Sequence, residues 1–138
     1  MAFNPDCLGR SYHAAPELID RPRHQAYAEA VGVDPAEARV MGRPLVCFAA
    51  VYLLWPTVHQ LFTDPEVGLD LEHLLHGEQE FSFEQALAFG DSVHPNGEIT
   101  LVDRRRGMVF LDFRSEGRDG AGRLLLHGRS RFVVRETA

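Results

Sequence analysis

The chain has 138 residues, enough for one domain with a buried core, and its 45% hydrophobic and 25% charged residues are ordinary values for a globular protein. A net charge of −6 argues against a nucleic-acid-binding protein, because phosphate groups require a basic face. Two cysteines, Cys7 and Cys47, are too few for a disulfide framework. Residues 1–10 lack the apolar core of a signal peptide, and the longest apolar run, residues 45–55, is shorter than the about 20 residues that span a membrane. We therefore expect a cytoplasmic protein.

The first part of the chain is predicted to hold a short strand near residues 10–14 and a helix over residues 21–32. Pro22 suits the first turn of this helix and Gly32 suits its end. Its modest apolar face is expected to consist of Ala26, Ala30 and Val31.

Residues 45–62 form the dominant feature, a predicted long helix. Its first eleven residues are apolar all round, whereas a surface helix would show a polar stripe, so we expect burial on nearly every side, with Cys47 packed as a small hydrophobic residue. Pro56 predicts a kink or break near Ala50–Leu54. This helix is therefore expected to form the centre of the core.

After a loop at residues 63–68 the hydrophobic period changes from helix to strand. Gln79, Phe81 and Phe83 alternate with hydrophilic neighbours, which predicts a strand with one solvated face. Three further strands are predicted within residues 88–103, 108–117 and 123–136, with turns at 104–107 and 118–122. An antiparallel sheet curled around one apolar helix satisfies this order, so the fold class is α+β. No repeat, low-complexity segment or linker divides the chain, which favours a single domain over residues 1–138.

Three segments carry a resemblance to a known family. "HGEQEFSFEQALAFGDSV" (76–93) resembles a strand and Gly-Asp turn of MaoC-like dehydratases, which have the hot-dog fold. "GRPLVCFAAVYLLWPTVHQLFTDPEVGLDL" (42–71) is similar to their central helix, and residues 104–136 are similar to their last two strands. The chain looks most like the N-terminal-type, non-catalytic half of R-specific hydratases and dehydratases. The resemblance implies a hot-dog domain that pairs with a second one and needs no cofactor, with a CoA or acyl-carrier-protein thioester as substrate.

Catalytic members of that family carry a Gly-Asp-x-Asn-Pro-x-His element before the central helix, whose Asp and His move the two protons of a dehydration. The corresponding segment here, "AVGVDPAEARVMGRPL" (30–45), has an Asp and a Pro but neither Asn nor His. Asp34 is better explained as a helix cap, since Pro35 and Glu37 follow at the first and third helical positions. Asp34 and His76 are the fallback catalytic candidates if the chain has acid–base chemistry of its own.

The resemblance also implies substrate contacts around the start of the central helix. Helix N-termini present free N–H groups that can hold a thioester carbonyl, and the alternative is a plain turn that starts a helix. Tyr52 and Trp55 are expected in the core or in an acyl pocket. The predicted substrate-binding residues are Gly42, Arg43, Pro44, Leu45, Tyr52 and Trp55.

Two further clusters have a structural and a functional interpretation. His73 and His76 would share a face if helical, but the strand pattern begins here, so we expect no metal site. A basic triplet, Arg104, Arg105 and Arg106, is either a solvated turn or a contact for an acidic carrier protein.

Three functions remain open. The first is a substrate-binding subunit of an R-specific 3-hydroxyacyl-thioester dehydratase whose hot-dog partner supplies Asp and His. The second is a self-sufficient dehydratase, isomerase or cyclase of an acyl or polyketide pathway. The third is a non-catalytic module that binds an acyl chain or a carrier protein. A homodimer and a heterodimer are both consistent with the sequence.

Overall fold

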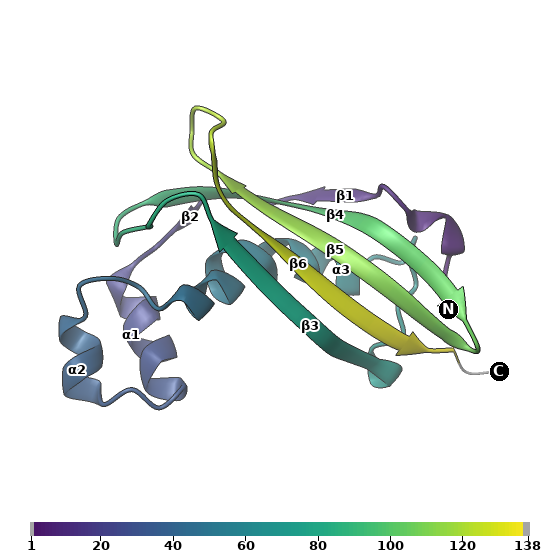
Figure 1. The fold of residues 1–138 in the computed structure, drawn as a ribbon, viewed down its shortest axis with the longest axis horizontal. Coiled ribbons are helices and arrows are strands. Elements are labelled where there is room, and N and C mark those ends of the chain that lie inside the picture. The colour runs from purple at the N-terminus through teal and green to yellow at the C-terminus, as the bar shows by residue number, and fades with distance from the viewer. Residues whose placement is uncertain (1, 137–138) are drawn as a thin grey trace.

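The structure, a computed structural model, describes residues 2–136. One antiparallel sheet lies over a broken central helix, and two short helices lie beyond one end of the sheet (Figure 1). The strand order is β1-β4-β5-β6-β3, with β2 beside β4. The elements are η1 (Pro5–Cys7), β1 (Ser11–His13), β2 (Glu17–Leu18), α1 (Arg21–Ala30), α2 (Pro35–Val40), η2 (Val46–Phe48), η3 (Ala50–Leu54), α3 (Trp55–Phe62), η4 (Leu71–His73), β3 (Leu74–Phe83), β4 (Ser92–Arg105), β5 (Met108–Arg118) and β6 (Leu124–Arg135).

The predicted α+β class and its antiparallel strands are confirmed. β3 begins at Leu74, and from Glu78 to Phe83 its residues alternate between exposed and partly buried, as the sequence pattern predicts. β4 extends into the basic triplet, so the turn consists of Arg106 and Gly107, both with positive φ, of 53° and 76°. Glycine adopts this conformation freely and other residues seldom do, so the turn is specified by its second residue. The two-residue strand β2 was not predicted.

The central helix is divided into three pieces, with the break where the sequence places it. A 3-10 turn, η2, leads into a π-helical turn, η3, and then into α3. The amide of Trp55 donates to the carbonyl of Ala50, five residues earlier, which is the widened π pattern. Pro56 follows at once and has no N–H to donate, so the regular α pattern cannot extend back through it.

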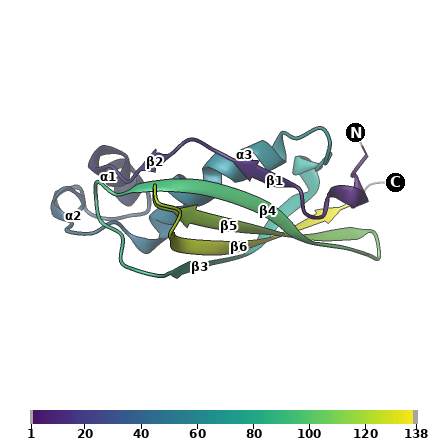
Figure 2. The same ribbon diagram turned by 90° about the horizontal axis from the view of Figure 1, so that it is seen from above.

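Burial of the central helix on nearly every side was a wrong prediction. Phe48 and Leu53 are fully buried against the sheet, but Val46 is 66% exposed and Trp55 is 55% exposed. Cys47, expected in the core, is also exposed. The physical reason is that one sheet covers one face of the helix, and the view from above shows the opposite face uncovered (Figure 2). The open face of the helix is apolar, so it is buried only if a second molecule packs against it.

The core forms two clusters between the helix and the inner face of the sheet. One packs Val58 and Leu61 of α3 against Phe113 and Phe132 of the sheet. The other packs Phe48 and Leu53 of the helix against Val93 and Leu126. No helix within residues 2–136 has the length and hydrophobicity needed to cross a membrane.

Candidate functional site

A pocket of about 360 Å³ lies where the chain enters the central helix and faces the end of β3. Its volume lies at the lower end of the range of small-molecule sites, roughly 300–1,000 Å³. Four predicted substrate-binding residues line it, Arg43, Pro44, Leu45 and Tyr52, together with Val46, Phe83, Gln85, Ala86 and Leu87. Gly42 and Trp55, also predicted, lie outside this lining.

A buried histidine holds the wall of the pocket in place. The Leu45 amide donates to Nε2 of His24 at 2.9 Å, so the ring proton of His24 lies on Nδ1. His24 is 1% exposed, and its ring meets Phe48 and Phe89 edge-on at centroid distances of 5.1 and 5.0 Å. Burial lowers the pKa of His24, and the charge of Arg21 lowers it further. The neutral imidazole therefore anchors the pocket wall to α1.

Sequence reasoning missed His24 because it assigned α1 the wrong apolar face. Ala26, Ala30 and Val31 are exposed, which contradicts the predicted face. The buried residues of α1 are His24 and Ala28. Their spacing of four residues places them on one face of the helix, which is the pattern that could have identified the buried face. Histidine is not counted as an apolar residue, so the pattern was not recognised.

The His24 contact also changes the expected role of the helix start. The Leu45 amide is one of the donors predicted to hold a thioester carbonyl, and it is already used by His24. Tyr52 reaches the pocket from the π-helical turn and is 1% exposed. Burial raises the pKa of the Tyr52 hydroxyl well above its usual range, with a smaller contribution from Asp91, so the group is a neutral donor.

The two fallback catalytic residues are not brought together. Asp34 caps α2 by accepting from the Ala36 amide at 2.9 Å, as the structural interpretation predicts. His76 is exposed on β3, with a nitrogen 3.0 Å from the side-chain oxygen of Gln79 and its ring 4.8 Å from that of Phe132. α2 lies beyond one end of the sheet and β3 starts at the other (Figure 1). Neither side chain lines the pocket.

The histidine pair does not share a face. His73 closes η4, where its Nδ1 lies 2.7 Å from an Asp70 oxygen, while His76 belongs to β3. Across residues 2–136, no three or more His, Cys, Asp or Glu side chains gather closely enough to hold a metal ion.

The basic triplet stands at the end of the sheet far from the pocket (Figure 1). Arg104 forms an ion pair with Glu136 at 2.6 Å, and Arg105 forms one with Asp103 at 2.9 Å. Arg43, by contrast, is exposed at the pocket and forms no ion pair with any residue of the described chain. A cation is therefore available beside the pocket itself.

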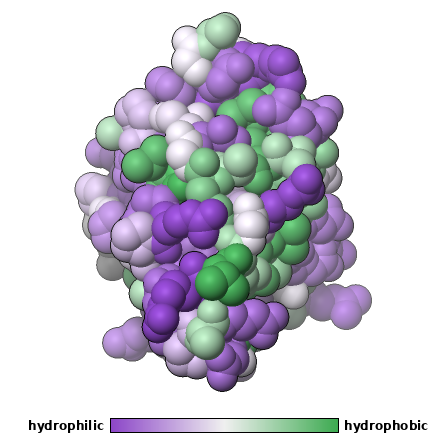
Figure 3. All heavy atoms as spheres, turned by 90° about the vertical axis from the view of Figure 1, so that its left-hand side faces the viewer, coloured by the Kyte–Doolittle hydropathy of each residue, from purple (hydrophilic) through white to green (hydrophobic). Residues whose placement is uncertain are grey.

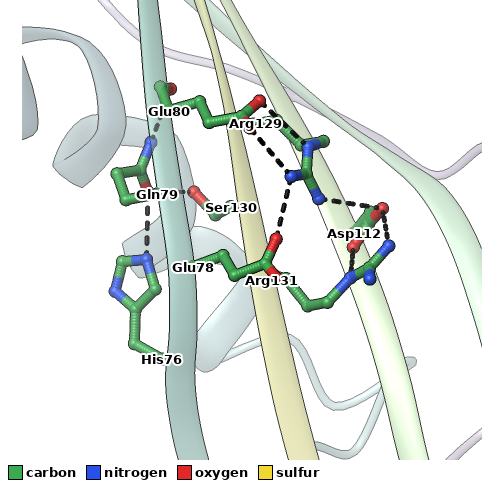
Figure 4. A network of polar contacts seen from close by, with 8 residues as sticks. All are labelled: His76, Glu78, Gln79, Glu80, Asp112, Arg129, Ser130 and Arg131. Atoms are coloured by element: carbon green, nitrogen blue, oxygen red, sulfur yellow. Dashed lines mark hydrogen bonds and ion pairs between the residues drawn. The ribbon is translucent and has the colours of Figure 1, made fainter.

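A charged network ties β3 to its neighbours across the outer face of the sheet (Figure 4). Asp112, 7% exposed, accepts two hydrogen bonds from Arg131, at 2.7 and 2.9 Å. These bonds lower the pKa of the Asp112 carboxyl. Arg129 links the same carboxylate to Glu78 and Glu80 of β3. The network fixes the position of β3 in the sheet, and we assign it no chemistry.

β3 is an edge strand with exposed apolar groups beside it. Its backbone pairs with β6 on one side, and no described strand pairs with the other. Leu75 on this strand is 70% exposed. Figure 3, which views the end where α1 and α2 lie, shows further apolar surface interrupted by hydrophilic side chains. An unpaired edge with exposed apolar side chains is a surface that another strand can join.

An antiparallel sheet over one central helix is the architecture of the hot-dog fold. Residues 7–127 match the family model described as FAS1-like, dehydratase domain region. The chain belongs to this family. It is 30% identical to a UPF0336 protein of Streptomyces coelicolor, over 98% of this chain and 97% of that one. It is 32% identical to a UPF0336 protein of Clavibacter michiganensis, with the same coverage of both chains.

Solved structures support the fold. The C-terminally truncated HadBC (3R-hydroxyacyl-ACP dehydratase) complex of Mycobacterium tuberculosis matches with a TM-score of 0.75 at 20% identity, over 93% of this chain and 97% of that one. The MaoC-like dehydratase of Rhodospirillum rubrum matches with 0.64 at 16%, over 100% and 99%. The ChsH1-ChsH2 complex of M. tuberculosis matches with 0.62 at 15%, over 94% and 84%. The predicted hot-dog fold and the resemblance to MaoC-like dehydratases are confirmed.

Proposed function

We propose that this chain is the substrate-binding subunit of an R-specific 3-hydroxyacyl-thioester dehydratase, and that a partner hot-dog subunit supplies the catalytic Asp and His. The observation that carries the proposal is the composition of the pocket. It is lined largely by apolar side chains, and none of its lining residues is an Asp, a Glu or a His. It suits an acyl chain and lacks the groups that dehydration needs.

Dehydration of a 3-hydroxyacyl thioester requires a base for the α-proton and an acid for the departing hydroxyl. Both groups must lie within about 2.6–3.2 Å of the atoms they serve. Tyr52 stays neutral because burial raises its pKa, and Arg43 is a permanent cation, so neither is suited to take the α-proton at neutral pH. A partner subunit is therefore assigned both proton transfers.

The free edge of β3 and the open face of the central helix are the proposed partner surface. The edge offers backbone N–H and C=O groups to a strand of the partner. Leu75 beside it and Trp55 on the helix are large apolar groups left exposed in the single chain. Two of the matching structures, HadBC and ChsH1-ChsH2, are described as complexes, which supports an assembly of two hot-dog chains here.

The pocket also orients the substrate in this proposal. The acyl chain enters between Leu45 and Leu87, and the thioester end stays near the exposed Arg43. At the thioester end, Arg43 would donate hydrogen bonds to the amide carbonyl groups of the pantetheine arm, which CoA and acyl carrier proteins share. Arg104–Arg106 lie at the far end of the sheet, so a contact there would involve the body of a carrier protein and not its arm.

The test is reconstitution of activity. The chain is purified alone and together with hot-dog proteins of its own organism that carry an intact Asp-Asn-Pro-His element, and hydration of enoyl-CoA substrates is measured. We expect activity in one complex, loss of it when the partner's catalytic Asp is changed to Asn, and none in the isolated chain. Robust hydration by the isolated chain would contradict the proposal.

A matched pair of variants tests the partner surface. Leu75→Arg places a charge beside the free edge of β3, whereas Leu8→Arg changes a residue of similar exposure, 62% against 70%, away from it. We expect only Leu75→Arg to abolish complex formation in size-exclusion chromatography. Acyl-thioester binding without activity in any complex would instead favour a non-catalytic acyl-binding module.

A further inference from the structure

The hydroxyl of Tyr52 is an unusual group in the pocket. Tyr52 is 1% exposed, and no residue of the described chain donates to or accepts from its hydroxyl. Tyr12, by comparison, is 8% exposed and donates to an Asp64 oxygen at 2.6 Å. Buried hydroxyls are nearly always hydrogen-bonded, so one left free in a pocket indicates a missing partner.

The Tyr52 hydroxyl is accessible from the pocket and not sealed in the core. Among the described residues, Ser115 Oγ is the only fully enclosed side-chain polar atom without a partner. The small exposed fraction of Tyr52 therefore includes its hydroxyl oxygen, and Tyr52 lines the pocket. A ligand in the pocket can reach this group.

The surroundings of Tyr52 indicate which part of a ligand it meets. Arg43 is exposed and marks the solvent side of the pocket, where a bulky CoA or carrier must stay. Tyr52 is buried and lies on the inner side, among Leu45, Phe83 and Leu87. The thioester belongs near Arg43, so Tyr52 faces the distal part of the acyl chain.

We propose that Tyr52 is a specificity-determining residue that selects an acyl chain carrying an oxygen, a keto or hydroxyl group, at an interior carbon distant from the thioester. The inference rests on the proposed function and narrows its substrate class from acyl thioesters in general to oxygenated ones. The Tyr52 hydroxyl donates a hydrogen bond to that oxygen. A plain saturated chain leaves the hydroxyl unpaired and is bound less tightly.

The test compares Tyr52→Phe, which removes only the hydroxyl, with the wild-type chain. Two thioether analogues of acyl-CoA are used, of equal chain length and resistant to hydrolysis, one saturated and one with an interior keto group. Binding to the full chain is measured by isothermal titration calorimetry. The wild-type chain is expected to bind the keto analogue about 10–100-fold more tightly than the saturated one. Tyr52→Phe is expected to lose most of that preference and to bind the saturated analogue at least as well as wild type.

Tyr12→Phe is the matched control, because it removes a hydroxyl that is bonded within the protein and lies in another part of the core. It should keep the full preference for the keto analogue. Three results would overturn the inference: no preference in the wild-type chain, a preference retained in Tyr52→Phe, or no binding of either analogue. An equal loss of affinity for both analogues in Tyr52→Phe would assign the hydroxyl to a part of the ligand that both analogues share, and would also overturn the inference.

The outcome is separable from that of the proposed function. Binding preference is measured on this chain without a partner, whereas the proposed function is tested by activity of the complex. An active complex without a keto preference overturns only the inference about Tyr52. A preference that depends on Tyr52, in a chain that activates no partner, overturns only the dehydratase role.

Discussion

Replacing His24 by Leu should destabilise the protein and loosen the pocket wall. Leucine fills a similar volume between Phe48 and Phe89, but it cannot accept the hydrogen bond that the Leu45 amide donates to His24. Loss of one partly shielded hydrogen bond costs about 1–2 kcal/mol, and loss of the edge-on ring contacts about 1 kcal/mol more. We expect the free energy of unfolding to fall by about 2–3 kcal/mol at pH 7.5.

The same contact predicts a pH dependence with a definite sign. Burial lowers the pKa of His24 below its ordinary value of 6.5. As the pH falls through 6.5 the unfolded chain takes up a proton at this residue before the folded chain does. The stabilisation from His24 is thus complete above that pH and is lost progressively as the pH falls toward the lowered pKa. The stability difference between wild type and His24→Leu should therefore narrow between pH 7.5 and pH 5.

Urea denaturation of both chains at several pH values measures this difference directly. The chain has seven histidines, so the comparison between variants isolates the contribution of His24. His24→Gln is the control, because its side-chain oxygen can accept from the Leu45 amide but does not titrate. A Leu variant as stable as wild type at pH 7.5, or a difference that stays constant down to pH 5, would refute the assigned role of His24.

Three other substitutions have expected outcomes. Asp34→Ala should lower the free energy of unfolding by about 0.5–2 kcal/mol through loss of a helix cap and leave the activity of the complex unchanged. If the variant is fully folded but the complex is inactive, Asp34 is catalytic. Gly97→Ala should destabilise the protein by about 2 kcal/mol or more, because the added Cβ would overlap the ring of Phe113. Thermal unfolding measures this, and an unchanged midpoint would contradict the packing. Asp112→Asn should cost about 1.5–3 kcal/mol at pH 7, since it removes a charged acceptor of Arg131. The pKa of Asp112 is lowered below 3.8, so this difference should persist to about pH 4 and shrink in stronger acid; a constant difference would exclude the ion pair.

Local patterns in the sequence predict much of the fold. The alternation of Phe81 and Phe83 with hydrophilic residues predicts β3 because successive side chains of a strand point to opposite faces. Pro56 predicts the irregular turn at Ala50–Leu54 because it lacks an amide hydrogen. The Asp34 cap follows from three neighbouring residues alone. Each of these features depends on interactions within one element, which is the range over which periodicity and capping act.

The features that the sequence does not predict depend on distant residues. The Leu45 amide and His24 are 21 positions apart, and the hydrogen bond between them forms only after α1 has packed. The wall of the pocket at Phe83–Leu87 comes from another part of the chain altogether. An apolar run in the sequence also does not indicate whether a sheet will cover the helix on one face or on both. For this reason the exposure of Val46 was not predicted.

Val46 links the pocket to the proposed partner surface. It lines the pocket, yet it is 66% exposed, so it belongs both to the binding site and to the open face of the central helix. A partner seated on that face would cover Val46 and close this side of the pocket against water. Exclusion of water strengthens every polar contact inside, including one from the Tyr52 hydroxyl. Substrate binding and partner binding should therefore reinforce each other, since each completes a surface that the other leaves partly open.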